Sequence, residues 1–188
     1  MFSFDVTELF QEREFFPQLT WASLKRAELV IGYLFPESLR NLLFLKNGGY
    51  FKPELESWAA ELYGIDPNGR MGIEGAWKTL LFEWEYPNVG IPIMSTLSAG
   101  HDEYFLDMRF QKPGEEPPVI RIDNELDNTF YYVAPSLSDF LIMIRDRKDV
   151  MGIETPQNFV QKYGSLINRK VPAIFLKEEK KEEDLPRE

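Results

Sequence analysis

The stretch "SAGHDEYFLDMR" (residues 98–109) decides the fold of this sequence, because a turn of small residues leads directly into a strand pattern. Apolar and polar side chains alternate from residue 103 to residue 110, so the two sets point to opposite faces of an extended chain. A second strand pattern at 118–123 follows the Pro113–Gly114 pair, whose order suits a type II turn. The two strands are therefore predicted to form a hairpin, with one face on the core and one charged face in solvent.

Charged residues on the second face of this hairpin have a simple structural explanation. Ile120 of the partner strand is expected on the core face, so Arg121 and Asp123 share the opposite face with Asp107 and Arg109. Opposite charges on neighbouring strands stabilise a sheet by roughly 0.2–1 kcal/mol per pair. We expect Asp107 and Arg109 to pair with Arg121 and Asp123 across the hairpin.

The same stretch contains the best candidates for catalysis, among them His101, the single histidine of the chain. His101 and Asp102 are neighbours, so on a strand they point to opposite faces, and Asp107 lies about 20 Å further along. Acid–base chemistry needs hydrogen-bond contact, and a metal site would depend on one histidine. A metal-assisted hydrolase centred on His101 and Asp102 stays an alternative, but we expect no catalytic residue, no metal site and no cofactor.

Patterns along the whole chain define the fold class. Helices are predicted over 5–16, 20–31, 36–46, 74–85 and 137–148, and strands over 61–66, 90–97, 103–110, 118–123 and 129–134. This order is typical of an α+β fold in which helices pack on one face of an antiparallel meander sheet. We expect a single domain over residues 1–176, including a short helix from Thr155, and a charged mobile tail over residues 177–188.

The composition narrows the class of protein. The 188-residue chain contains no cysteine and has a formal net charge of −10, from 31 acidic and 21 basic side chains. This charge disfavours nucleic acid and anionic membranes as partners, whereas it favours a basic protein partner. No apolar run approaches the roughly 18 residues of a transmembrane helix, and the N-terminus lacks a signal-peptide pattern, so a cytoplasmic protein is expected.

Several short motifs occur in an order that resembles the SUKH superfamily over about residues 20–148, in particular its branch of fungal cell-wall assembly regulators. The motifs are a proline that opens a helix, an Asn-Gly-Gly that ends it, a Gly-x-Asp-x-x-x-Leu-Asp strand entry, a Gly-Glu-Pro-Pro-Val turn and a serine-led helix. The matching positions are Pro36, Asn47, Gly48, Gly49, Gly100, Asp102, Leu106, Asp107, Gly114, Val119, Ser136, Phe140 and Leu141. The chain departs from the pattern at Phe35, at Ala99, where glycine is common, and at Glu115–Glu116, which contains an additional glutamate.

The resemblance implies a protein-binding domain without catalytic residues. Bacterial members are similar to immunity proteins, which bind and neutralise a cognate polymorphic toxin, often a nuclease, whereas fungal members resemble scaffolds in cell-wall assembly and signalling. We expect the first role, with the scaffold role as an alternative. The expected contact residues for a basic toxin domain are Asp102, Glu103, Glu115, Glu116 and Trp84. The expected structural residues are Pro36, Asn47, Gly48, Gly49, Gly100 and Asp107.

Overall fold

The computed structural model describes residues 2–55, 59–111, 115–126, 128–150 and 152–154. The predicted turn at Pro113–Gly114, the predicted helix from Thr155 and the predicted tail 177–188 lie outside the described residues. The domain boundary expected at residue 176 therefore stays a prediction.

The described residues contain four α-helices, four shorter helical turns and seven strands. The α-helices are α1 (Trp21–Ile31), α2 (Glu37–Leu45), α3 (Gly72–Lys78) and α4 (Leu137–Arg145). The strands are β1 (Gly49–Tyr50), β2 (Glu61–Leu62), β3 (Gly90–Ser95), β4 (Asp102–Asp107), β5 (Val119–Asp123), β6 (Thr129–Ala134) and β7 (Ile153–Glu154). The shorter turns are η1 (Val6–Leu9), η2 (Pro53–Leu55), η3 (Thr79–Glu83), which is a π-helical turn, and η4 (Met108–Phe110).

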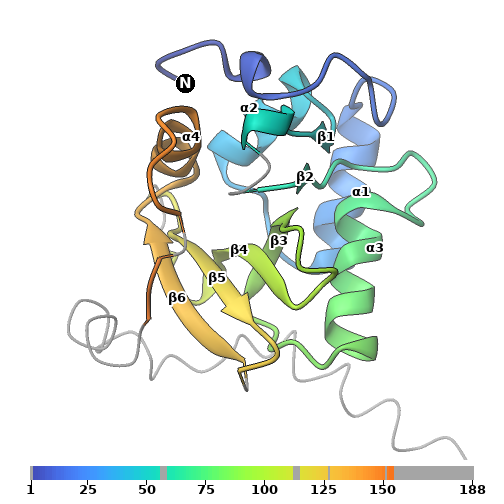
Figure 1. Ribbon diagram of the computed structural model, residues 1–188. Coiled ribbons are helices and arrows are strands. Elements are labelled where there is room, and N and C mark those ends of the chain that lie inside the picture. Colours follow the sequence, from blue (N-terminus) through green and yellow to red (C-terminus); the bar gives the residue numbers. More distant parts are fainter. Residues whose placement is uncertain (1, 56–58, 112–114, 127, 151, 155–188) are drawn as a thin grey trace, which may run out of the picture.

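Each strand pairs antiparallel with the next strand along the chain, so the sheet order is β1-β2-β3-β4-β5-β6-β7. Figure 1 shows β3 to β6 side by side. Helix α4 lies next to β6, and helices α1 and α3 lie on the side of β3. The predicted α+β antiparallel meander is confirmed. Its larger core lies between the sheet and the apolar sides of α1, α2 and α4.

Local sequence signals determine where the helices begin and end. The Thr20 hydroxyl accepts the Ser23 N–H (3.1 Å) at the start of α1, and the Ser136 hydroxyl accepts the Asp139 N–H (3.1 Å) at the start of α4. Gly32, at φ 81°, ends α1 in the left-handed conformation that suits glycine. These helices and α2 confirm their predictions within a few residues.

Two helix predictions are wrong in extent. Residues 5–16 form only the turn η1, because the backbone of Phe10 pairs with Phe51 as a β-bridge and leaves the helix. The pattern over 74–85 begins earlier, at Gly72, and its last part is the π-helical turn η3. Tertiary pairing thus overrides a helical pattern at the N-terminus, which sequence periodicity cannot detect.

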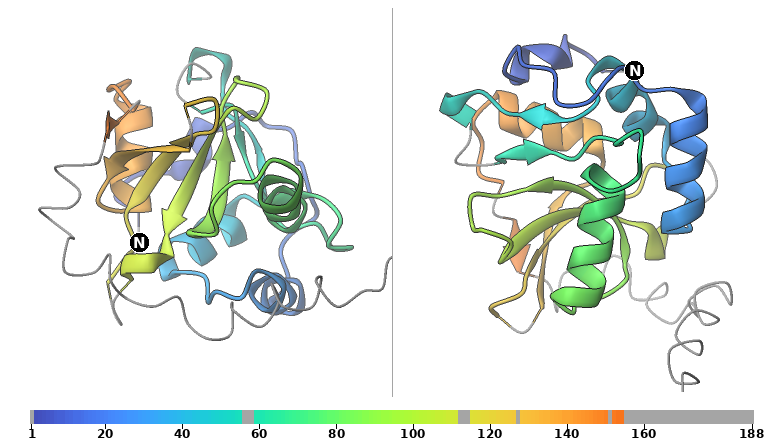
Figure 2. Two further views of the ribbon diagram at one scale, coloured as in Figure 1. Left: turned by 90° about the horizontal axis from the view of Figure 1, so that it is seen from below. Right: turned by 90° about the vertical axis from the view of Figure 1, so that its right-hand side faces the viewer.

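The second face of the sheet is buried, which corrects the prediction of a solvated charged face. Tyr104 lies opposite Arg121, and Phe105 lies opposite Ile120, so Ile120 shares a face with Phe105 and not with Tyr104. A smaller core covers this face, and its buried members are Leu80, Tyr86, Val89, Phe105, Ile120 and Ile122. In both views of Figure 2, the segment of α3 and η3 lies against this face, on the side of the strands opposite α4. Strand β4 is therefore buried from both sides.

The Asn47-Gly48-Gly49 motif connects α2 to the sheet. The Asn47 side-chain amide donates to the carbonyls of Pro17 (2.7 Å) and Ile65 (3.0 Å), and its Oδ1 accepts the Ile65 N–H (2.7 Å). Gly48 adopts φ 80°, and a Cβ there would lie 2.8 Å from the backbone nitrogen of Gly64. The Asn47 side chain thus gives the backbone of Ile65 the hydrogen bonds that a neighbouring strand would otherwise provide. Gly48 permits the close approach of its own backbone to that of Gly64.

Replacing Asn47 with alanine is expected to lower the free energy of unfolding by about 2–4 kcal/mol, because the buried N–H and C=O of Ile65 lose their partners. Urea unfolding followed by circular dichroism measures this change. The matched control is Asn68→Ala on an exposed loop, which is expected to change stability by less than about 0.5 kcal/mol. Equal effects of the two substitutions would contradict the structural role of Asn47.

Candidate partner-binding surface

The charged residues of β4 pair with different partners and do not form one cluster. Asp102 forms an ion pair with Arg121, whose guanidinium also lies 3.9 Å from Asp123 and 4.0 Å from the centre of the Tyr131 ring. Arg121 is buried, so its charge is balanced inside the fold by the two carboxylates and by the aromatic ring. Asp102 is partly exposed at the start of the strand, where its outer edge is accessible to a partner.

Glu103, expected to be a contact residue, is not accessible to a partner. Glu103 is buried, with 2% of its surface exposed. The Tyr63 hydroxyl donates a hydrogen bond to its carboxyl group (2.9 Å), and burial raises the pKa of Glu103 to about 8. Glu103 is therefore a buried, largely protonated residue of the core at neutral pH.

Asp107 pairs within its own turn and not across the hairpin, which corrects the predicted cross-strand pairs. Strand β4 ends at Asp107, and the chain then curls into η4. The fully buried Asp107 carboxylate accepts the backbone N–H of Arg109 (3.1 Å) and two guanidinium hydrogen bonds from the same residue (2.9 and 2.7 Å). Burial raises the pKa of Asp107, and the Arg109 guanidinium opposes this shift. The Asp107 carboxylate thus holds the turn that follows β4.

His101 and Asp102 do not form the dyad that a hydrolase would need. The Nδ1 atom of His101 lies 3.3 Å from Glu125, and both side chains are more than half exposed, whereas Asp102 contacts Arg121. Within the described ranges, no group of three or more His, Asp or Glu side chains could hold a metal ion. The geometry thus gives the hydrolase alternative no support.

Glu115 and Glu116 lie at the other end of the hairpin from Asp102. Strand β4 separates the two ends by about 17 Å at the usual rise per residue. Glu116 accepts hydrogen bonds from the backbone N–H (3.2 Å) and the hydroxyl (2.5 Å) of Ser38. Because Pro36 provides no side-chain cap for α2, Glu116 takes the capping role from a distant part of the chain. Glu116 is thus bound to α2, and both Glu115 and Glu116 are exposed on the surface.

Trp84 lies in a surface that several loops build together. It follows η3 and is 39% exposed, and its six-membered ring lies against Gly100, where a Cβ would come within 1.8 Å of the indole. The Tyr86 hydroxyl donates to the Gly100 carbonyl (2.8 Å), and the Asn124 side chain donates to the Trp84 carbonyl (3.1 Å). The backbone N–H of Asn124 donates to the His101 carbonyl (2.8 Å). Hydrogen bonds between these loops therefore hold Trp84 in place.

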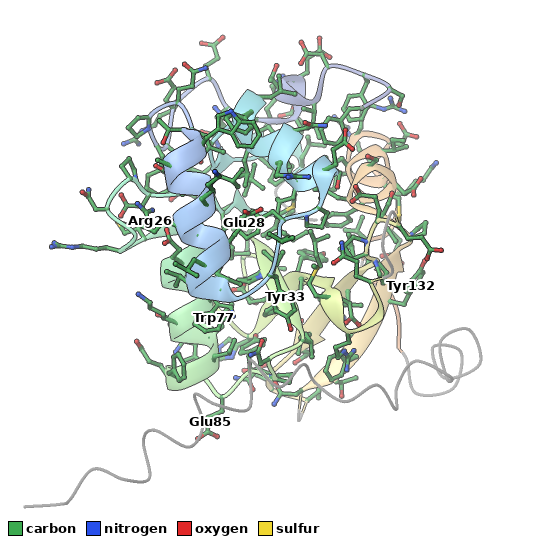
Figure 3. The ribbon with its side chains drawn as sticks, turned by 180° about the vertical axis from the view of Figure 1, so that it is seen from behind. Arg26, Glu28, Tyr33, Trp77, Glu85 and Tyr132 are labelled. Atoms are coloured by element: carbon green, nitrogen blue, oxygen red, sulfur yellow. The ribbon has the colours of Figure 1, made fainter. Side chains whose placement is uncertain are left out.

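We call Trp84 and the loops 97–101 and 124–126 the tryptophan surface. Leu97 and Leu126 are exposed apolar residues of these loops, and Glu125 adds an exposed carboxylate. Glu85, which follows Trp84 at φ 57°, points into solvent beyond the lower end of α3 in Figure 3. An aromatic centre with a partly charged rim is the usual composition of a protein–protein interface.

The sequence predicted only part of this surface. Trp84 and Asp102 were among the expected contact residues, but Leu97, Glu125 and Leu126 were not. These three lie in loops, where no periodicity distinguishes an exposed apolar residue from a buried one. The sequence feature that could have pointed to these loops is the Ala99–Gly100 turn, which comes directly before the predicted strand.

The described residues thus form an α+β domain with a partly exposed aromatic surface. The model of the SMI1 / KNR4 family (SUKH-1) matches residues 18–143, more than half of the chain. The chain belongs to this family, whose domains are non-enzymatic protein-interaction modules, and the resemblance seen in the motifs is confirmed. No curated protein matches the chain. Among the described residues, no helix has the length and apolar character needed to cross a membrane.

Replacing Gly100 with alanine is expected to displace the Trp84 ring, because the new Cβ and the indole cannot occupy the same space. The expected loss of stability is about 1–3 kcal/mol, together with a change in tryptophan fluorescence. The matched control is Ala99→Gly in the same turn: Ala99 adopts φ 56°, so glycine should leave fluorescence unchanged and stability equal or higher. An unchanged Gly100→Ala protein would contradict the described contact.

Glu103 makes stability depend on pH. Because its pKa rises from 4.5 in the unfolded chain to about 8 in the fold, the native state binds the extra proton between these values, and stability falls as pH rises through this window. The slope is at most about 1.4 kcal/mol per pH unit. Glutamine does not titrate, so the Glu103→Gln variant lacks this pH dependence of the free energy of unfolding. The variant should therefore gain stability relative to the parent as pH increases from 5 to 8. Parallel stability profiles of the two proteins in urea unfolding would contradict the burial of Glu103, and the exposed Glu83→Gln serves as the control.

Proposed function

We propose that the chain is an immunity protein that binds and neutralises a cognate toxin domain through the tryptophan surface. The observation that carries this proposal is the prearranged Trp84 side chain, partly exposed and surrounded by loops with carboxylates. A partly exposed tryptophan held by hydrogen bonds between three segments loses little conformational entropy on binding. The family supports a protein partner, and the identity of that partner as a toxin is our proposal.

Charge supports a basic partner. The chain carries a net charge of −10, and Asp102, Glu85 and Glu125 lie in or beside the tryptophan surface. Carboxylates accelerate association with a basic protein, and a toxin that cleaves nucleic acid has a basic substrate groove. The same charge argues against nucleic acid as a direct partner. A cytoplasmic location, where such a toxin acts, belongs to this proposal.

Glu115 provides a second candidate contact at the opposite end of the hairpin. Because the strand β4 separates it from Trp84, one small toxin domain does not need to contact both ends. Substitution of Glu115 therefore tests which end of the hairpin binds.

A growth assay tests the proposed function directly. The C-terminal domain of a large secreted protein encoded by an adjacent gene would be expressed in a bacterial host, alone or with the full chain. The expected result is that the chain restores growth, and that Trp84→Ala or Glu125→Lys weakens binding of the toxin domain at least tenfold by calorimetry. Glu115→Lys is the matched control and should bind normally. Growth arrest that the parent chain does not relieve would contradict the immunity role, and loss of binding in Glu115→Lys alone would place the contact at the other end.

A further inference from the structure

The N-terminal segment and α2 form an apolar groove far from the tryptophan surface. Phe2, Phe4, Phe44 and Leu45 provide apolar walls, and the groove has a volume of about 470 Å3. Leu45 is 60% exposed, although Leu39, Leu42 and Leu43 of the same helix are buried. A groove of this size and composition suits an apolar segment of another part of a protein.

The apolar surface continues onto α1. The Trp21 ring, 61% exposed, packs against Phe44 with ring centres 4.7 Å apart. On the other side, the Arg145 guanidinium covers the Phe4 ring at 4.7 Å. Figure 1 shows the N-terminal segment passing above α2 and near α4. The exposed aromatic surface thus extends the groove and would accommodate an extended segment of several residues.

The charged residues at the groove indicate which kind of segment it can bind. Asp5 and Glu37 line it, and the Arg145 guanidinium that covers the Phe4 ring is paired with Asp146 (2.8 Å). Hydrogen bonds from Thr7 lower the pKa of Asp5, so this carboxylate is ionised at neutral pH. The groove is therefore complementary to apolar side chains flanked by cations.

One segment of the same chain has this composition. Residues 169–177 read "RKVPAIFLK", in which six mainly apolar residues are flanked by Arg169, Lys170 and Lys177, with no acidic residue between them. Pro172 disfavours a helix and is compatible with an extended conformation. Apolar residues and charges of this segment thus match the walls and the carboxylates of the groove.

The length of the chain allows this segment to reach the groove. The last described residue, Glu154, pairs with Tyr131 at the edge of the sheet, and residues 155–168 can span up to about 46–50 Å. A folded unit of about 150 residues has a radius of gyration of about 15 Å, so this linker reaches most of its surface. Tethering also gives the segment an effective concentration of about 1 mM at the groove.

We propose that residues 169–177 bind in the groove formed by the N-terminal segment and α2 of the same chain. The bound segment covers Leu45, Phe44 and Trp21, and Lys177 lies near the carboxylates of the rim. The tryptophan surface stays free, so this contact is independent of the proposed immunity function and does not depend on a toxin.

Paramagnetic NMR on the full chain tests this proposal. Because the chain contains no cysteine, Glu179→Cys provides a single site for a nitroxide label. We expect the amide signals of Phe4, Asn41 and Leu45 to lose more than half of their intensity, and to regain it when Ile174→Asp and Phe175→Asp are added. The matched control is Leu185→Asp, an apolar residue outside the segment, which should leave the broadening unchanged.

Three results would overturn the proposal. The first is unbroadened signals of the groove residues, and the second is broadening that persists in the Ile174→Asp, Phe175→Asp variant. The third is broadening that appears only when a labelled chain is mixed with a separate isotope-enriched chain, since the occupant is then a second copy. Broadening within one molecule that depends on Ile174 and Phe175 supports the proposal.

Discussion

The ionisable side chains of β4 need partners inside the fold, because apolar layers cover both faces of this strand. Asp102 pairs with Arg121, Glu103 accepts a hydrogen bond from Tyr63, and Asp107 binds Arg109. Each of these contacts joins β4 to a different neighbour: β5, the residue that follows β2, or the turn after β4. A buried charge without its partner would cost several kcal/mol, so the Asp102–Arg121 pair between β4 and β5 favours the observed register of these two strands.

The two ends of the hairpin formed by β4 and β5 therefore have different structural roles. At one end, Glu116 caps α2 and Asp107 closes η4, so carboxylates that look available in sequence are used to hold helices and turns. At the other end, Gly100 makes room for Trp84, and loops joined by hydrogen bonds present it to solvent. The tryptophan surface therefore lies at the end where Gly100 and Trp84 meet, and not at the end held by Glu116 and Asp107.

Local signals allowed much of the fold to be predicted from the sequence. Thr20 and Ser136 cap helices where their side chains can reach free N–H groups, and the meander follows from consecutive short strands. The second sheet face could not be predicted, because alternation along β4 looks the same whether polar residues face water or another layer. For the same reason, Glu103 was predicted to be a contact residue although it is buried. Trp84, by contrast, is partly exposed in the tryptophan surface.

We propose that this SUKH-1 family domain binds its partner protein through the tryptophan surface. Amide hydrogen exchange of the free chain and of its complex with the partner tests this claim most directly. We predict slower exchange in residues 84–86, 97–101 and 124–126, with little change at residues 115–118. Protection at residues 115–118, with unchanged exchange around Trp84, would contradict it.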